Sequence, residues 1–284
     1  MQIRISAKAK INLGLDVLNR RPDGYHNIRT VMQTVTLCDD LIFSDSSEKG
    51  IRLFSDSQAV PLNESNLIWK AAQLMINEFS LTKGIFIRLE KNIPVAAGLA
   101  GGSTDAAATL SAVNRLFSLE LDDRALAGLG ARLGADVPFC IYGGTMLAEG
   151  IGELLTPLPP LQGCPVIIGK PKVSVSTRMA YESLDLSSLE HPDMAAILSS
   201  IQKEDPTLLP LHPGNVFAPG VIKMFPVIEN IIGKMEELGS FCSQMSGSGP
   251  SVFGLFPDRR SAEQACSNLS VTFPDSEFHL AFLG

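Results

Sequence analysis

One stretch decides the fold of this chain: Pro94-Val95-Ala96-Ala97-Gly98-Leu99-Ala100-Gly101-Gly102-Ser103-Thr104. It follows a strand-like run, 84–90, and precedes 105–110, which has the small and apolar residues of a helix. A glycine-rich turn between a strand and a helix can hold an anion, because glycine lets the backbone approach a ligand and the first helical N–H groups point at it. Ser103 and Thr104 add hydroxyl donors. The stretch is typical of a phosphate-binding loop.

The glycine spacing by itself leaves two explanations open. The loop has neither the Gly-Lys-Ser/Thr ending of a Walker loop nor the Gly-x-Gly-x-x-Gly spacing of a dinucleotide-binding loop, so it could also be a tight connection without a ligand. A second glycine-rich turn, 246–251, lies between two strand-like segments and has the same two explanations. Two such loops in one acidic protein favour a polyphosphate site.

The composition is that of a globular protein with a sizeable core, since 45% of the 284 residues are hydrophobic and 19% are charged. The formal net charge of −7 disfavours nucleic acids and anionic membranes as partners and favours a small molecule. Charges interrupt the N-terminal segment too often for a signal peptide, and no apolar run reaches membrane-spanning length, so we expect a cytoplasmic protein. The oligomeric state is left open.

The grouping of strand-like and helical segments predicts an α+β fold, because strands and helices do not strictly alternate. Alternating apolar residues in the first part of the chain predict an antiparallel meander with a turn at 22–25, and helical spacing follows at 66–79. A proline cluster at 157–160 interrupts regular structure. We therefore expect two domains, 1–159 and 160–284.

Lys10 and Asp136 are the candidate catalytic side chains. Lys8 and Lys10 share one face of a strand, which either an exposed face or a catalytic lysine explains. Asp136 lies among small and apolar residues, where its carboxylate either caps a short turn before Pro138 or accepts a proton from a substrate hydroxyl. Spacing alone leaves both alternatives open for each residue.

Gly24-Tyr25-His26 places an aromatic ring beside an imidazole. Such a pair can stack on a nucleic base and form hydrogen bonds with it, and it is also common as a plain surface turn. The pair is a candidate base-binding site.

Four separated parts of the chain together resemble the GHMP superfamily of small-molecule kinases. They are 7–13, 21–26, 94–104 with 134–139, and 245–250. Two of them, 22–26 and 134–139, point to members whose substrate carries a cytidine diphosphate. The resemblance spans nearly the whole chain and implies a two-domain α+β fold, with an N-terminal domain like ribosomal protein S5 domain 2 and a C-terminal ferredoxin-like domain.

The resemblance also implies the chemistry, which is phosphorylation of a small-molecule hydroxyl group by ATP, with Mg²⁺ expected and its ligands unknown. Residues 1–159 would bind ATP and carry catalysis, and 160–284 would lie on the substrate side. The ATP phosphates would bind at 94–104, and Lys10 and Asp136 would be the catalytic pair.

Four residues are implied on the substrate side. Tyr25 and His26 would hold the cytosine base, Tyr181 resembles a second aromatic ring that sandwiches the base, and Asn12 matches a position near the substrate. The alternatives are a kinase of the same superfamily acting on homoserine, mevalonate or a sugar, whose substrates have no base to stack, and a nucleotide sensor without turnover.

The chain departs from the family pattern at two positions of the glycine loop. Ala100 stands where many relatives have glycine, and Thr104 where serine is usual. A methyl group at Ala100 costs little if the residue has a negative φ, and Thr104 keeps the hydroxyl group. These departures therefore concern the geometry of the loop and not the activity.

Overall fold

The computed structural model describes residues 1–184 and 189–284, which form two compact units. Unit 1 comprises residues 1–9, 38–95 and 100–143, and unit 2 comprises 10–37, 96–99 and 144–284. The first two strands, β1 (Gln2–Arg20) and β2 (His26–Ser46), therefore contribute to both units. The two units are defined by contacts, and each combines separate segments of the chain. They therefore do not test the predicted boundary between 1–159 and 160–284, which stays a prediction.

The sheet strands of unit 1 include a parallel pair that the sequence pattern does not predict. In unit 1, β4 (Gly84–Glu90) pairs antiparallel with residues 40–46 of β2 and parallel with β3 (Ile51–Ser55). Parallel neighbours need a crossover connection, which α1 (Leu67–Glu78) supplies between β3 and β4. The predicted meander concerned segments within 3–45, and the sequence pattern does not predict β3 or its parallel pairing.

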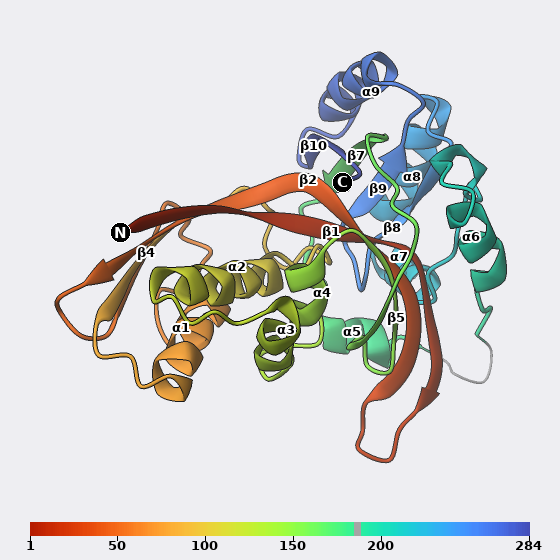
Figure 1. The fold of residues 1–284 in the computed structure, drawn as a ribbon. Helices are drawn as coiled ribbons and strands as arrows, with labels where there is room; N and C mark the ends of the chain where they lie inside the picture. Colours follow the sequence, from red (N-terminus) through yellow and green to blue (C-terminus); the bar gives the residue numbers. More distant parts are fainter. Residues whose placement is uncertain (185–188) are drawn as a thin grey trace. The chain divides into compact units, whose positions relative to one another are not determined.

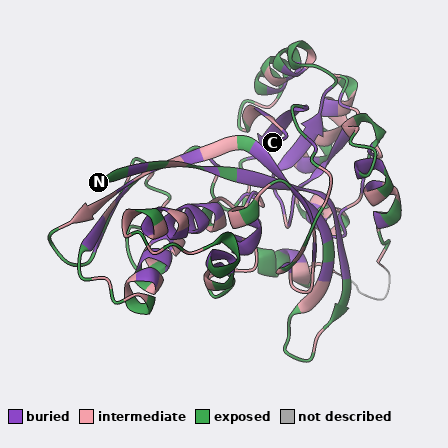
Figure 2. Ribbon diagram, in the orientation of Figure 1, coloured by how far each residue is buried: buried purple, intermediate pink, exposed green. Residues whose placement is uncertain are grey.

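α2 (Gly101–Leu116) is the helix on which the other helices of unit 1 pack. Figure 1 shows α1 and α2 side by side, and α3 (Asp123–Ala131) and α4 (Val137–Tyr142) also contact α2. Much of α2 is buried (purple in Figure 2), and its alanine-rich sequence allows neighbouring helices to approach closely. The helix begins at Gly101, earlier than the predicted start at 105, so the last residues of the glycine loop form its first turn.

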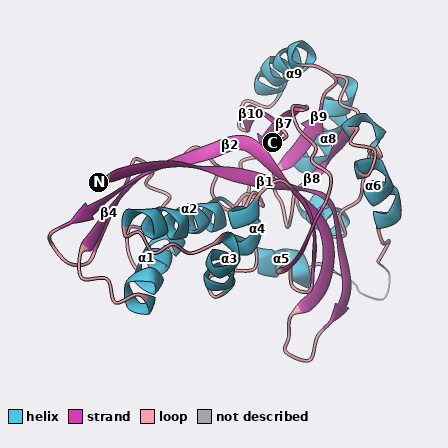
Figure 3. Ribbon diagram, in the orientation of Figure 1, coloured by secondary structure: helices cyan, strands magenta, loops and turns pink. Residues whose placement is uncertain are grey.

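Unit 2 contains an antiparallel strand pair, β5 (Thr145–Glu149) with β6 (Leu154–Pro157), and a separate antiparallel sheet (Figure 3). The sheet has the order β10–β7–β9–β8. Its strands are β7 (Pro165–Lys170), β8 (Cys242–Met245), β9 (Val252–Leu255) and β10 (Glu277–Phe282). Helical segments connect β7 to β8 and β9 to β10, which is the ferredoxin-like arrangement that the resemblance implies.

The helices of unit 2 are short, and two of them cover its sheet. They are α5 (Thr177–Glu182), α6 (Met194–Ile201), the 3₁₀ helix η1 (Pro206–Leu208), α7 (Ala218–Met224), α8 (Val227–Glu237) and α9 (Arg259–Thr272). α8 packs on β8 and β9, and α9 packs on β7 and β10. The sequence pattern predicts neither α7 nor α4, since both are too short to show a helical period.

Each unit has its own apolar core. The core of unit 1 includes Phe43 and Ile85 from its strands, and the core of unit 2 includes Ile167, Phe256 and Leu269. Within residues 1–184 and 189–284, no helix has both the length and the apolar character that crossing a membrane requires.

Candidate active site

The glycine loop joins β4 to α2, as predicted, and its backbone turns through left-handed conformations. Gly98 has a φ of +75°, and a Cβ there would lie 2.4 Å from the backbone oxygen of Ser246, so only glycine fits. Ala96 and Ala100 have φ angles of 52° and 57°. The condition of a negative φ at Ala100 is therefore not met, and its methyl group costs about 1–2 kcal/mol in this conformation.

The start of α2 fits an anionic ligand. Ala100 occupies the N-cap position and has no polar side chain to cap the helix. The first intrahelical hydrogen bond runs from Thr104 N–H to the Ala100 carbonyl at 2.9 Å, so the N–H groups of 101–103 precede it and are available to phosphate oxygens. The Ser103 residue is half-buried and Thr104 is buried, which makes Ser103 the better placed hydroxyl donor.

Lys10 is buried, in contrast to Lys8 on the same strand. Lys10 is 5% exposed because β1 is covered on both faces from residue 9 to residue 17, so the exposed-face explanation holds for Lys8 and is wrong for Lys10. The Lys10 Nζ donates to Asn12 Oδ1 at 2.7 Å and to the Gly98 carbonyl at 3.3 Å. Asn12 Nδ2 in turn donates to Thr30 Oγ1 at 2.8 Å, which fixes the orientation of the amide. The structure thus brings Lys10 and Asn12 to the glycine loop.

The two glycine-rich loops contact each other in unit 2. Ser246 Oγ donates to the Gly98 carbonyl at 3.2 Å, and Ser251 N–H donates to the Ala97 carbonyl at 3.3 Å. A Cβ at Gly247 would lie 3.0 Å from the Gly98 oxygen, so both loops need glycine at the contact. The second loop is the turn of the β8–β9 hairpin and also supports the first loop, and sequence spacing does not reveal this contact.

Asp136 occupies the N-cap position of α4, yet its side chain makes no capping hydrogen bond to this helix, all of whose residues are described. Its backbone φ and ψ are −79° and −15°, which are helical rather than the extended values of a capping residue. The alternative that the carboxylate caps a turn is therefore wrong. Asp136 belongs to unit 1 and Lys10 to unit 2, so their action as a pair stays a prediction.

Two of the candidate base-binding residues, His26 and Tyr181, contact each other. The rings of His26 and Tyr181 are stacked, with centroids 4.6 Å apart and planes at 21°, and Tyr181 meets Phe217 edge-on at 4.8 Å. Burial, with a smaller effect of Arg20, lowers the pKa of His26, so its imidazole is neutral at pH 7 and offers one donor and one acceptor. Tyr25 is exposed. The sequence gives no signal for Phe217, which lies outside the predicted elements.

The turn that carries Tyr25 is held by Asp23. The Asp23 carboxylate accepts the Tyr25 N–H at 3.1 Å and a hydrogen bond from Arg21 Nε at 3.0 Å, and the bond from Arg21 holds the pKa of this carboxyl below its usual range. Gly24 follows with a φ of +89°, a conformation that glycine adopts without strain. The local sequence thus fixes the hairpin tip next to His26.

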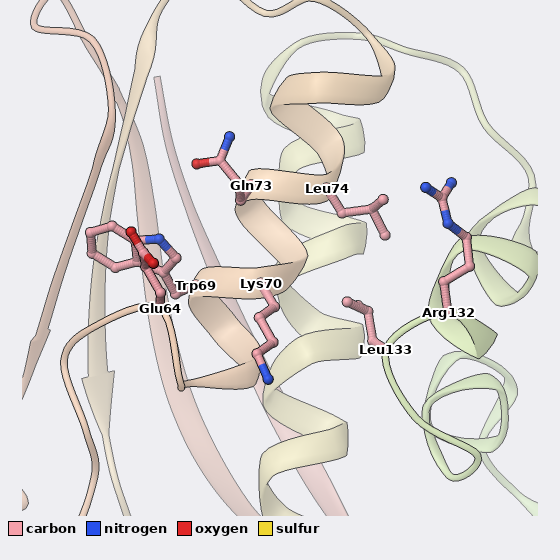
Figure 4. Close-up of a pocket in the computed structure, with 7 residues that line it drawn as sticks. All are labelled: Glu64, Trp69, Lys70, Gln73, Leu74, Arg132 and Leu133. Atoms are coloured by element: carbon pink, nitrogen blue, oxygen red, sulfur yellow. The ribbon is translucent and has the colours of Figure 1, made fainter.

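A further pocket in unit 1 lies around α1, and it contains none of the predicted site residues. It is lined by Glu64, Trp69, Lys70, Gln73, Leu74, Arg132 and Leu133. Figure 4 shows Glu64 and Trp69 on one side of α1 and Leu74 on the other, so these side chains do not converge on one point. Among the described residues, no group of three His, Cys, Asp or Glu side chains could hold a metal ion.

Comparisons with known proteins agree on one family. The family described as GHMP kinases N terminal domain matches residues 66–144, and GHMP kinases C terminal matches 187–275. A 4-diphosphocytidyl-2-C-methyl-D-erythritol kinase of Lachnospira eligens is 50% identical over 91% of this chain and 90% of its own length. A crystal structure of 4-(cytidine 5'-diphospho)-2C-methyl-D-erythritol kinase has a TM-score of 0.83 at 33% identity, covering 99% of this chain and 100% of that one.

A second solved structure shares the fold alone. Homoserine kinase from Cytophaga hutchinsonii has a TM-score of 0.78 at 20% identity, covering 99% of this chain and 95% of that chain. The fold is therefore common to kinases of different substrates, and the substrate must be argued from the site.

Substitution of Gly98 tests whether the contact between the two glycine loops supports the site. Gly98→Ala places a methyl group against the Ser246 carbonyl at a left-handed φ, so we expect a loss of at least about 2 kcal/mol in the free energy of unfolding and a raised KM for ATP. Chemical denaturation and steady-state kinetics measure these effects.

Gly128→Ala is the matched control, because Gly128 lies inside α3 and the added Cβ would meet no atom within 4 Å beyond its chain neighbours and the backbone of its own helix. It should raise stability by about 0.5–1 kcal/mol and leave the KM for ATP unchanged. Equal behaviour of the two variants would contradict the role assigned to Gly98.

Proposed function

The chain belongs to the GHMP kinase family and within it to the 4-diphosphocytidyl-2-C-methyl-D-erythritol kinases, and from this premise we propose how its residues carry the reaction. The reaction transfers the γ-phosphoryl group of ATP to the 2-hydroxyl of 4-diphosphocytidyl-2-C-methyl-D-erythritol, in the non-mevalonate route to isoprenoid precursors. The observation that carries the assignment is the high identity to named relatives over nearly the full chain. The assignment of roles to residues is our proposal.

ATP is proposed to bind with its phosphates at 94–104. The support is the uncapped start of α2, where the N–H groups of 101–103 and the Ser103 hydroxyl are donors to phosphate oxygens. Mg²⁺ commonly enters kinases bound to the phosphates of the nucleotide and needs few protein ligands, so we expect it to accompany ATP. The glycine loop then positions the transferred group, which is the main catalytic requirement of phosphoryl transfer.

Lys10 is proposed to stabilise the charge that develops on the transferred phosphoryl group. Its ammonium group is buried and is oriented by the oxygen atoms of Asn12 and Gly98, so it is fixed before the reaction begins. A preorganised cation away from bulk water stabilises developing negative charge strongly, because it needs no reorganisation during the step.

Asp136 is proposed as the base that accepts the proton of the 2-hydroxyl group. The support is that Asp136 is half-buried and that its carboxylate does not cap α4, the helix that begins beside it. A carboxylate within reach of a hydroxyl can accept its proton as the oxygen attacks phosphorus.

The cytosine base is proposed to bind at Tyr25, His26 and Tyr181. Neutral His26 can donate to or accept from the polar edge of a base, and the tyrosine rings offer stacking faces. The His26 imidazole already stacks on one face of the Tyr181 ring. A base that stacks on this face therefore has to displace the imidazole from it. Phe217 packs edge-on against Tyr181 and holds its ring plane.

Asp136→Asn separates the catalytic role from a structural one. The amide keeps the size of the side chain and removes the proton acceptor, so we expect turnover to fall by about 10²–10⁴-fold while KM for ATP and for substrate change little. Single-turnover rates measured beside thermal denaturation check this. A variant that is less stable and fully active would refute the role of base.

Lys10→Met tests the preorganised cation, with Lys8→Met as its matched control on the same strand. We expect kcat to fall by at least about 10²-fold for Lys10→Met, since the charge is needed most in the transition state. Lys8 is exposed, and its replacement should leave kcat unchanged. Loss of activity in both variants, or in neither, would argue against a specific role for Lys10.

The substrate assignment is tested by assaying each candidate substrate separately. Purified protein with ATP should form ADP with 4-diphosphocytidyl-2-C-methyl-D-erythritol and not with homoserine or mevalonate, because only the first has a base to bind. ADP formation with homoserine or mevalonate alone would favour the alternative kinases, and binding without any turnover would favour a sensor.

Tyr25→Ala should weaken binding of 4-diphosphocytidyl-2-C-methyl-D-erythritol by about 1–3 kcal/mol and leave the KM for ATP unchanged.

A further inference from the structure

A buried cluster of three ionisable residues lies next to the glycine loop in unit 1, and the proposed mechanism does not use it. The side chains of Asp39, Lys91 and Asp105 are 0%, 7% and 3% exposed. Lys91 Nζ donates to a carboxylate oxygen of Asp39 and, at 3.2 Å, to Asp105 Oδ2. Such burial of ionisable groups is rare unless they are paired.

The cluster ties both ends of the glycine loop to strand β2. Asp39, on β2, accepts the backbone N–H groups of Asn92 and Ile93 at 2.6 and 2.7 Å, and these residues lead directly into the loop. Asp105 lies in the second turn of α2, at the other end of the loop. Lys91 also lies close to the first residue of α2, since a Cβ at Gly101 would lie 3.0 Å from Lys91 Nζ.

The charges of the cluster do not balance if both acids are ionised, because two carboxylates would share one ammonium group. Asp105 Oδ1 is buried and has no hydrogen-bond partner among residues 1–184 and 189–284. Burial raises the pKa of Asp105 to about 8, with Asp39 adding to the rise and Lys91 opposing it. At neutral pH the cluster is therefore a neutral set, with Asp39 and Lys91 charged and Asp105 protonated.

The other elements packed on α2 present apolar side chains to the core of unit 1. They are Ile68 and Ala71 from α1, Leu126 from α3, and Val137 from α4. The charged groups that act on Asp105 are thus Lys91 and Asp39.

We propose that Asp105 is a positioning residue for ATP, which supports phosphate binding at the start of α2 only while it carries a proton. With Asp105 neutral, the cluster has no net charge, and the positive end of the α2 dipole attracts phosphate. Ionised Asp105 adds a buried negative charge beside that helix end and opposes the phosphates. The inference rests on the proposed binding of ATP at 94–104.

The test compares the KM for ATP of the unsubstituted protein and of Asp105→Asn between pH 6 and 9.5. Asparagine has the size of the protonated acid and cannot ionise. We expect the KM of the unsubstituted protein to rise about threefold to thirtyfold as pH passes about 8, and the KM of Asp105→Asn to stay constant. Asp123→Asn, an exposed acid in the first turn of α3, is the matched control and should follow the unsubstituted protein.

A second readout follows the proton without ATP. Because the folded protein holds a proton on Asp105 that the unfolded chain releases near pH 4, its Tm should fall relative to that of Asp105→Asn between about pH 4 and pH 8 and then run parallel. A Tm difference that does not change with pH would overturn the proposal.

The kinetic outcomes are also decisive. A KM for ATP that is constant with pH in the unsubstituted protein, or that still rises in Asp105→Asn, would overturn the proposal. Absence of any ATP turnover in the unsubstituted protein would contradict the proposed function instead, and the Tm comparison would then still decide whether Asp105 carries the proton.

Discussion

The carbonyl oxygen of Gly98 is the point on which the candidate site in unit 2 depends. It accepts hydrogen bonds from the Lys10 ammonium group and from the Ser246 hydroxyl group, and thereby joins β1, the first glycine loop and the turn of the β8–β9 hairpin. Three segments far apart in the sequence meet at one backbone atom, and the absence of a Cβ at Gly98 makes this approach possible. Lys10 is therefore oriented by the same contact that shapes the loop.

Charged side chains are buried in both units next to the glycine loop, and each is stabilised in a different way. In unit 2, Lys10 is held by the amide oxygen of Asn12 and the carbonyl of Gly98. In unit 1, Lys91 lies between Asp39 and Asp105, where burial keeps a proton on Asp105. Removing a charge from water is unfavourable, so these residues restrict the backbone beside them to conformations that satisfy the charges.

The shared fold and the proposed base-binding residues belong to different parts of the chain. The ferredoxin-like sheet of unit 2 and the loop before α2 belong to a fold shared with a homoserine kinase at low identity, so they do not select a substrate. His26, Tyr181 and Phe217 form an aromatic group in which His26 stacks on Tyr181 and Phe217 meets Tyr181 edge-on. In the function we propose, His26 and Tyr181 of this group bind the base together with Tyr25, and the common fold does not select the substrate.

The sequence by itself determined the α+β class, the succession of a strand, the glycine loop and a helix, and the turn at 22–25. Each of these follows from local periodicity or turn chemistry. Only the tertiary structure decided that Lys10 is buried while Lys8 is exposed. The alternating pattern assigns each residue to a face of the strand, but it does not show what covers that face. The tertiary structure also decided the parallel pairing of β3 and the clustering of Lys91 with residues 52 and 14 positions away. These features depend on contacts between distant segments, which have no signature in a short window of sequence.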